Sequence, residues 1–362
     1  MALKSYKSIK TKPRSKLEIR TFTKQDVDQV VKMSMIHFPE NSAIELNQLK
    51  DNFHSNLSDS YQSLVCSSSD GVIHGYLSVQ MVEFNFKGSV VTGAILSDFM
   101  VNEKARSALV PMRMLQKALN GPQDFSFSED AVQASRLLWC KLGGQIAFPY
   151  STYYTIPLRL LSFSIQMAGK NLSPRLKKIA GTAAKKADKI METFKVSPFY
   201  VPPRKELSVR KLNSQQLHEG LRSIITNHDL FPSVNSASLG SFLNLIRNER
   251  QYGKPEGVAL CDSEGKTIGW FIYYQSDSGR CNVIHAESLP GKEEELYISL
   301  KINALSKGAV NITGRLSPRQ VGSSFSEQTI SRPGGKWALV HSKNPEILHT
   351  IQTGKAFLTR CW

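Results

Sequence analysis

Hydrophobic and polar residues in the front half of the chain follow two different periods. Some stretches alternate with a period of two, which predicts strands with one buried face, while others space apolar residues three and four apart, which predicts helices. Strands are expected at residues 17–21, 63–66, 72–82, 90–101, 125–127 and 151–159. Helices are expected at residues 26–35, 43–53, 110–119 and 131–142. This order predicts a mixed sheet with helices on both faces.

The back half repeats this order after a lysine-rich helix at residues 174–195. An apolar stripe on that helix predicts docking against a lobe: Leu176, Ile179, Ala183, Ala187, Ile190 and Phe194. Prolines 198, 202 and 203 then break the helix. Further strands are expected at 207–212, 257–261, 267–275, 282–287 and 310–315, with helices from Gln215, from Ser238 and over 292–307. The repeated order predicts two related lobes.

The length of 362 residues is sufficient for two domains with separate cores. We therefore predict an α/β (α+β) fold in which two tandem lobes each hold a mixed central sheet flanked by helices. The predicted boundaries are a basic disordered tail at 1–16, an N-terminal lobe at 17–160, a basic helical linker at 161–206 and a C-terminal lobe at 207–362.

The formal net charge of +16 is concentrated outside the predicted lobes. Residues 1–16 carry six basic and no acidic side chains, and residues 163–205 carry ten basic and two acidic side chains. Two interpretations are open: solubility with loose electrostatic attraction, or contact with anionic lipid or nucleic acid. The first is favoured, because no aromatic side chains alternate with the lysines and no nucleic-acid motif is present.

Neither a membrane span nor a metal site is expected. The most apolar stretch, 153–168, is interrupted by polar residues, and the basic N-terminus has no apolar core behind it as a secretory signal would. The five cysteines are scattered without the paired spacing of a zinc site, which favours free thiols in a reducing cytoplasm.

Residues 98–144 carry most of the functional information. A strand ending at Asp98–Val101 leads through a basic turn with Lys104 and Arg106 onto a helix. The first turn of a helix leaves amide donors free and carries the positive end of the dipole, so this arrangement predicts an anion site. Arg106 adds a forked donor suited to phosphate, although a solvated loop cation is an equally good interpretation.

Two sequence motifs carry a resemblance to a known family. Val101-Asn-Glu-Lys-Ala-Arg106 before a helix, and Ala134-Ser-Arg-Leu-Leu-Trp-Cys-Lys-Leu-Gly143, resemble the cofactor motifs of the GCN5-related N-acetyltransferase (GNAT) superfamily. The stretches 308–319, 339–346 and 357–360 resemble a group of bacterial, two-lobed GNAT-like proteins. The resemblance implies tandem GNAT-like lobes, the first binding acetyl-CoA or another acyl-CoA, with no metal ion.

The resemblance also implies site residues. Two neighbouring parallel strands would part around the donor's pantetheine arm, with backbone amides near Met100 and Val101 on the thioester carbonyl. The remaining implied donor contacts are Arg106, Ser107, Ala108, Leu109 and Val110 for the pyrophosphate, and Ser135 and Arg136 for the adenosine phosphate.

The chain departs from the superfamily pattern at two places. After Arg106 it reads Ser-Ala-Leu-Val-Pro, so the glycines of the pyrophosphate loop are missing. Trp139 occupies the position where many relatives carry a tyrosine that protonates the leaving thiolate, and we expect Trp139 to pack in the core. Tyr154 is the candidate replacement acid, with Tyr150 and Tyr153 as alternatives. Asp98 is either the base that deprotonates the amine or a salt-bridge partner.

The expected function is transfer of an acyl group from acyl-CoA to a primary amine, with an amino sugar of cell-envelope or exopolysaccharide synthesis as acceptor. The second lobe would shape the acceptor groove, because three acids at 293–295 would repel pyrophosphate. Two alternatives stay open: a catalytically degenerate binding protein, and a Fem-type ligase that uses aminoacyl-tRNA and contacts RNA through the basic linker.

Overall fold

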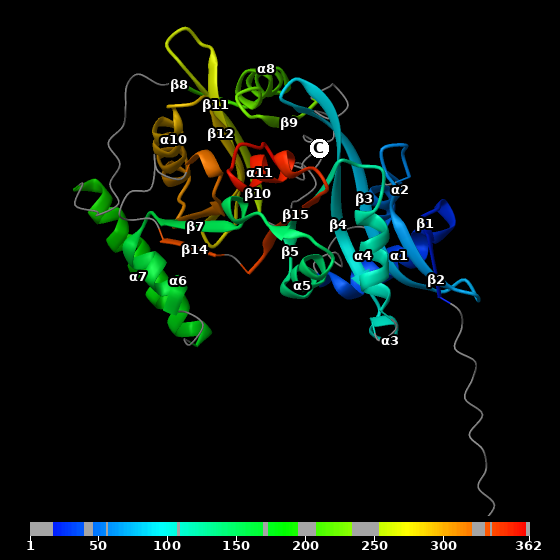
Figure 1. Cartoon of the computed structure of the whole chain (residues 1–362). Helices are drawn as coiled ribbons and strands as arrows, with labels where there is room; N and C mark the ends of the chain where they lie inside the picture. The colour runs from blue at the N-terminus through cyan, green and yellow to red at the C-terminus, as the bar shows by residue number, and fades with distance from the viewer. Residues whose placement is uncertain are drawn as a thin grey trace, which may run out of the picture. The chain divides into compact units, whose positions relative to one another are not determined.

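The computed structural model describes residues 17–39, 46–55, 57–106, 109–168, 173–194, 208–233, 253–320, 330–333 and 335–359 (Figure 1). The chain divides into two compact units, residues 1–81 with 96–121, and residues 82–95 with 122–362. The predicted tail and the helix expected from Ser238 lie outside the described residues. None of the described helices is both long enough and apolar enough to span a bilayer.

The first unit is an antiparallel arrangement of strands with helices. Its elements are β1 (Leu17–Thr21), η1 (Lys24–Asp26), α1 (Val27–His37), α2 (Leu46–Ser55), β2 (Leu64–Ser68), the first part of β3 (Ile73–Phe86), the last part of β4 (Ser89–Val101), α3 (Glu103–Arg106) and α4 (Val110–Leu119). Hydrogen bonds order the strands β1-β2-β3-β4. Tyr76 lies at the centre of the core, and Phe22 and Phe53 pack edge-on against its ring.

The turn between β3 and β4 matches its sequence prediction. Lys87 and Gly88 have φ angles of 50° and 91°, the left-handed pair that a two-residue hairpin requires. The predicted turn at Asp70-Gly71 is also observed, with Gly71 at φ 79°. Strands β3 and β4 each run from one unit into the other.

In the second unit, one group of strands pairs with the first part of β4. Its elements are β5 (Phe125–Ala131), α5 (Gln133–Lys141), β6 (Gln145–Ile146), η3 (Phe148–Tyr150), α8 (Ser214–Ile225), β9 (Leu230–Pro232), β15 (Trp337–Ser342) and α11 (Pro345–Gln352). The strand order is β4-β5-β15-β6, and β9 pairs with the end of β3. The predicted strand at 125–127 therefore continues to Ala131.

The second unit also contains a complete second sheet of seven strands. In sheet order these are β14 (Ile330–Pro333), β7 (Thr152–Pro157), β13 (Asn311–Arg315), β12 (Arg280–Ser288), β11 (Thr267–Gln275), β10 (Lys254–Cys261) and β8 (Ser208–Lys211). The helices that accompany it are α6 (Leu160–Ala168), α7 (Pro174–Thr193) and α10 (Glu293–Ser306), and the short helix η5 covers Pro318–Gln320.

Two strands belong to the other sheet from the one that the predicted lobes assign to them. The sequence assigns the strand at 151–159 to the first lobe, but β7 pairs with β13 and β14 of the second sheet. Conversely, β15 comes from near the C-terminus and pairs with β5. Strand periodicity shows which face is buried but not which neighbour is chosen, so this correction could not be obtained from the pattern.

Each sheet contains one strand–helix–strand unit with a parallel strand pair: β4–α4–β5 and β12–α10–β13. Both parallel ladders are short. The first pairs Gly93–Ile95 with Phe125–Phe127, and the second pairs Arg280–Val283 with Asn311–Gly314. No further pair of either ladder is found among the described residues, although β4 continues to Val101 and β12 to Ser288. This repetition confirms the prediction of tandem mixed sheets flanked by helices.

Candidate functional site

A left-handed residue lies within β4 near its end. Asp98 has a φ of 47°, and its side chain is exposed. A non-glycine residue with a positive φ is uncommon within a strand, although aspartate tolerates it better than most, and such conformations are concentrated at functional sites. Tyr61 lies close enough to Asp98 for their charges to interact: burial, followed by the negative charge of Asp98, raises the pKa of Tyr61 to about 12. This residue thus presents an exposed carboxylate within electrostatic range of a phenol.

The end of β4 is held in place by burial of one residue and by hydrogen bonds to the next. Met100 is fully buried in the core of the first unit. The carbonyl oxygen of Val101 accepts a hydrogen bond from Nε of Arg106 at 3.1 Å, and Nε2 of His37 lies 3.2 Å from the same oxygen. Arg106 therefore ties the strand end to the following turn while its guanidinium remains exposed.

The start of α4 adopts the conformation that the missing glycine would favour. Leu109 has a φ of 58°, its side chain is 62% exposed, and its carbonyl accepts the amide of Arg113 at 3.0 Å. The first turn contains no acidic residue, and Pro111 occupies it without an N–H. The residue before α4 therefore has the backbone conformation that a glycine would adopt there. No acidic side chain in the first turn neutralises the positive end of the helix dipole.

The predicted site residues are distributed over both units. Asp98, Met100, Val101, Arg106, Leu109 and Val110 belong to the first unit, whereas Ser135, Arg136 and Tyr154 belong to the second. Ser107 and Ala108 lie outside the described residues. In the second unit, the guanidinium of Arg136 lies over the ring of Trp337, 4.7 Å from its centroid, so it is partly occupied by a cation–π contact.

Tyr154 is enclosed in the core of the second sheet. Its side chain is 1% exposed and packs edge-on against Tyr297, with ring centroids 5.8 Å apart. Burial raises the pKa of Tyr154 well above its ordinary value. Exchange of a proton with a substrate would require this core to open. Trp139 is 2% exposed, which confirms the predicted packing role.

A polar cluster in the second unit was missed by sequence reasoning. Arg315 on β13 donates to the Glu129 carbonyl at 2.7 Å, to the Asp130 carboxylate at 2.6 Å and to the Tyr153 hydroxyl at 2.9 Å. Burial opposes its charge, but the carboxylates of Glu129 and Asp130 outweigh this, and the pKa of Arg315 is raised. The available signal was the acidic pair that follows the hydrophobic strand at 125–127.

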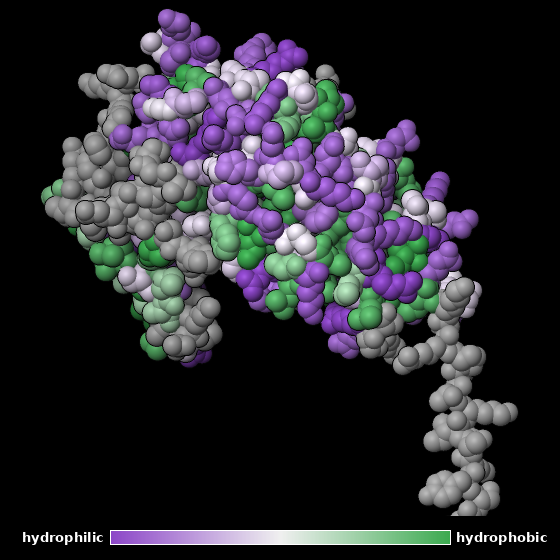
Figure 2. All heavy atoms as spheres, viewed as in Figure 1, coloured by the Kyte–Doolittle hydropathy of each residue, from purple (hydrophilic) through white to green (hydrophobic). Residues whose placement is uncertain are grey.

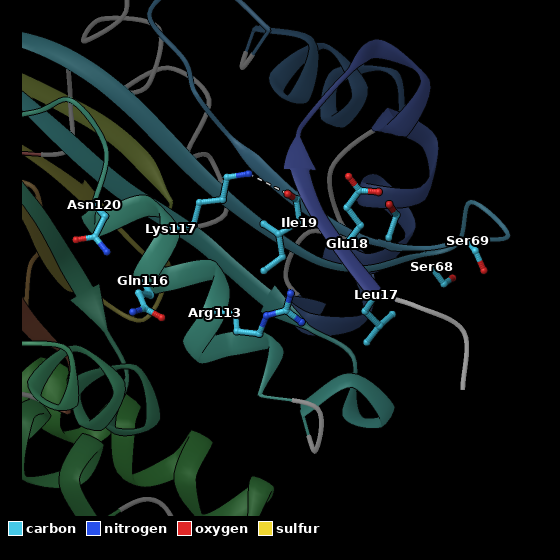
Figure 3. Close-up of a pocket in the computed structure, with 10 residues that line it drawn as sticks. Leu17, Glu18, Ile19, Ser68, Ser69, Arg113, Gln116, Lys117 and Asn120 are labelled. Carbon is cyan, nitrogen blue, oxygen red and sulfur yellow. Dashed lines mark hydrogen bonds between the residues drawn. The ribbon is translucent and has the colours of Figure 1, made fainter. Parts of the chain in front are cut away.

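A pocket of about 680 Å³ opens on the flank of α4 in the first unit (Figure 3). Arg113 and Lys117 of α4 line it together with residues of β1, and Nζ of Lys117 donates to the Ile19 carbonyl at 2.9 Å. None of the residues predicted from the sequence lines this pocket. Within the described ranges, no three His, Cys, Asp or Glu side chains gather as a metal site requires.

Comparisons with known proteins find similarity in structure. No protein-family model matches the chain, and neither does any curated protein. A GCN5-related N-acetyltransferase from Kribbella flavida superposes with a TM-score of 0.55 at 13% identity, over 90% of this chain and 71% of that one. A probable N-acyltransferase from Enterococcus faecalis gives 0.59 at 12% identity, over 93% and 74%.

A more distant enzyme has the same architecture. The N-myristoyltransferase of Saccharomyces cerevisiae, solved with bound myristoyl-CoA, gives a TM-score of 0.50 at 12% identity, over 93% of this chain and 80% of that one. Each superposition covers at least 90% of the present chain, and therefore includes both sheets. The chain thus has a GNAT-like fold repeated in tandem.

Proposed function

We propose that the protein is an N-acyltransferase that moves an acyl group from acyl-CoA to a primary amine. The observation that carries this proposal is the pair of left-handed residues, Asp98 and Leu109, on either side of the turn from β4 into α4. The left-handed conformation is tolerated by aspartate but is unfavourable for leucine, and together the two residues shape the segment that should meet the donor. The architecture shared with acyltransferases supports the same reaction class.

The donor's pyrophosphate is assigned to the first turn of α4. Amide donors at a helix start and the uncompensated dipole favour an anion there. Arg106 places an exposed guanidinium at the preceding turn, where it is already oriented through its bond to Val101. Ser135 and Arg136 belong to the second unit, and their contact with the adenosine phosphate stays a sequence prediction.

The bound acyl-CoA supplies a thioester carbon that an amine can attack. The backbone amides near Met100 and Val101 would hold the carbonyl oxygen and stabilise the oxyanion. Asp98, exposed and beside Tyr61, would accept the proton of the attacking amine, directly or through water. The C–S bond then breaks, and the thiolate of CoA regains a proton from solvent. An amino sugar is the acceptor that we propose.

Calorimetry with acetyl-CoA and longer acyl-CoA thioesters tests the donor assignment. Arg106→Gln removes the charge but retains a side-chain donor for the Val101 carbonyl, so a loss of affinity of roughly tenfold would report the phosphate contact. Lys117→Gln is the matched control, because Lys117 lies in the last turn of the same helix, away from its start. Equal affinity of the Arg106→Gln variant and the unmodified protein would remove Arg106 from the site.

Release of free CoA thiol over a panel of amines, including glucosamine, tests the reaction itself. Donor-dependent thiol release with one class of amine would support catalysis and identify the acceptor. Tight binding of acyl-CoA without thiol release for any amine would support the degenerate binding protein instead. Failure to bind any acyl-CoA would overturn the proposal.

A further inference from the structure

The apolar stripe of α7 faces outward instead of docking. Leu176, Ile179, Ile190 and Phe194 are 57%, 69%, 59% and 71% exposed. The side of α7 that packs is a different one, where Ala184 and Asp188 are buried. The expected docking of this stripe is therefore wrong. Small residues on the opposite side allow close contact with α6, so the large apolar residues are left in solvent.

The two helices form a hairpin held by specific polar contacts. The carboxylate of Asp188 on α7 accepts the amides of Leu161 and Ser162 at 3.0 and 2.8 Å, and so caps the first turn of α6. Glu192 forms an ion pair with Arg159 just before α6, with Nε and Oε1 2.6 Å apart. These contacts fix which side of α7 faces outward.

The same contacts leave the outer side of α7 with positive charge. Its six basic residues are accompanied by two acidic residues, Asp188 and Glu192, and both acids are used within the hairpin. Lys178, Lys185 and Lys189 are exposed and follow one another at spacings that align them along the helix. This lysine row runs beside the apolar stripe.

Additional apolar side chains extend the exposed surface onto α6. Leu160, Leu161 and Met167 are 37%, 39% and 65% exposed. In Figure 2, hydrophobic spheres gather at the lower left, where Figure 1 draws α6 and α7. Several large apolar side chains exposed on one hairpin and bordered by charge are typical of an interaction site.

We propose that the outer side of the α6–α7 hairpin binds the surface of an anionic phospholipid bilayer. A helix with an apolar stripe beside a lysine row lies in the interface plane, with its apolar side chains among the acyl chains and its lysines at the phosphates. A second copy of the chain is disfavoured because two lysine rows would face each other in a symmetric contact. Nucleic acid is disfavoured because a stripe of aliphatic side chains offers no stacking platform.

Vesicle sedimentation with the full-length protein tests this proposal. We expect binding to phosphatidylcholine vesicles that contain about one-third phosphatidylglycerol, little binding to pure phosphatidylcholine, and weakening at high salt. The triple variant Lys178→Gln, Lys185→Gln, Lys189→Gln should lose about fivefold in affinity for each lysine removed. Ile179→Ser with Ile190→Ser should also weaken binding, because the buried apolar area is lost.

Matched controls separate the hairpin from general effects. Ile36→Ser with Val90→Ser removes two aliphatic residues that are 75% and 67% exposed elsewhere, and should leave vesicle binding unchanged. Circular dichroism checks that each variant folds. Equal binding to neutral and anionic vesicles, or undiminished binding by both hairpin variants, would overturn the proposal. So would a dimer that the Ile179→Ser, Ile190→Ser variant abolishes, because the stripe would then serve self-association. Donor binding is measured separately and does not depend on this outcome.

Discussion

The starts of α4 and α10 are equivalent places in two similar strand–helix–strand units, yet they have opposite electrostatic character. Each helix follows a strand that outlasts its parallel ladder. The first turn of α10 holds Glu293, Glu294 and Glu295, and Lys292 at its cap pairs with Glu295 at 3.1 Å. The first turn of α4 holds no acid. The same fold unit therefore neutralises its dipole in one sheet and leaves it available for an anion in the other.

The strand before α10 is also enclosed, in contrast to the exposed Asp98 on β4. His285 on β12 stacks on Trp270 and accepts the indole N–H through Nδ1 at 3.0 Å. Glu287, two residues further along, is buried beside His228, with Nε2 and Oε1 3.6 Å apart. The difference shows that the second sheet uses its equivalent strand for packing.

The largest predicted effect tests whether the interior around β12 is closed to water. Burial lowers the pKa of His285 to about 4 from an ordinary value of 6.5. In the unfolded chain His285 binds a proton below about pH 6.5, whereas in the native state it does so only near pH 4. The free energy of unfolding is therefore highest above pH 6.5 and decreases as the pH falls from 6.5 to 4. The free energy of unfolding should decrease by about 3 kcal/mol across this range because of His285.

Urea unfolding between pH 7 and pH 4 measures this slope. His285→Gln keeps an acceptor for the Trp270 indole but cannot titrate, so its stability should fall less steeply than that of the unmodified protein. Parallel curves for the two proteins would show that His285 is accessible to protons in the native state. The contrast between the buried strand β12 and the exposed Asp98 on β4 would then not hold.

The next effect tests the contrast between the two helix starts directly. Met112→Glu gives α4 an acid in its first turn, as α10 has. Donor affinity should decrease at least about tenfold by charge repulsion, while unfolding stability stays the same or rises by about 0.5 kcal/mol. Glu294→Gln on α10 is the matched control and should leave donor affinity unchanged. Unaltered donor affinity in the Met112→Glu variant would place the pyrophosphate elsewhere.

Local sequence patterns predicted the elements well because the physics behind them is local. The hairpin at Lys87-Gly88 and the helix over Pro174–Thr193 follow from turn conformation and helical spacing. The tandem mixed sheets followed from element order. The partners of β7 and β15 could not be predicted, because strand choice depends on long-range packing rather than on period.

Site residues were harder to predict because backbone conformation is not visible in side-chain identity. The sequence shows that glycine is missing at Leu109, but it does not show that the leucine itself adopts the left-handed conformation. The pairing of Tyr61 with Asp98 joins segments that are distant in sequence, and no local pattern indicates it. The roles assigned to these residues remain predictions.

A smaller effect concerns the start of α6, where a side chain of α7 accepts hydrogen bonds from the free backbone amides. The Asp188 carboxylate of α7 accepts two amides in the first turn of α6, so Asp188→Ala leaves both without a partner. A loss of roughly 1–2 kcal/mol in the free energy of unfolding is expected. Asp188→Asn, which can still accept, should lose less. Equal losses in the two variants would show that packing rather than capping determines the effect.

The smallest effect tests the strain at the start of α4. Glycine adopts a φ of 58° without the steric cost that leucine incurs, and the exposed Leu109 side chain gives up little burial on removal. Leu109→Gly should therefore change stability by no more than about 1 kcal/mol, in the stabilising direction. Leu109→Val is the counterpart, because a β-branched residue should be less stable than leucine there. If the glycine also tightens acyl-CoA binding while the valine weakens it, the left-handed turn acts on the donor; if stability changes and affinity does not, the strain belongs to the fold alone.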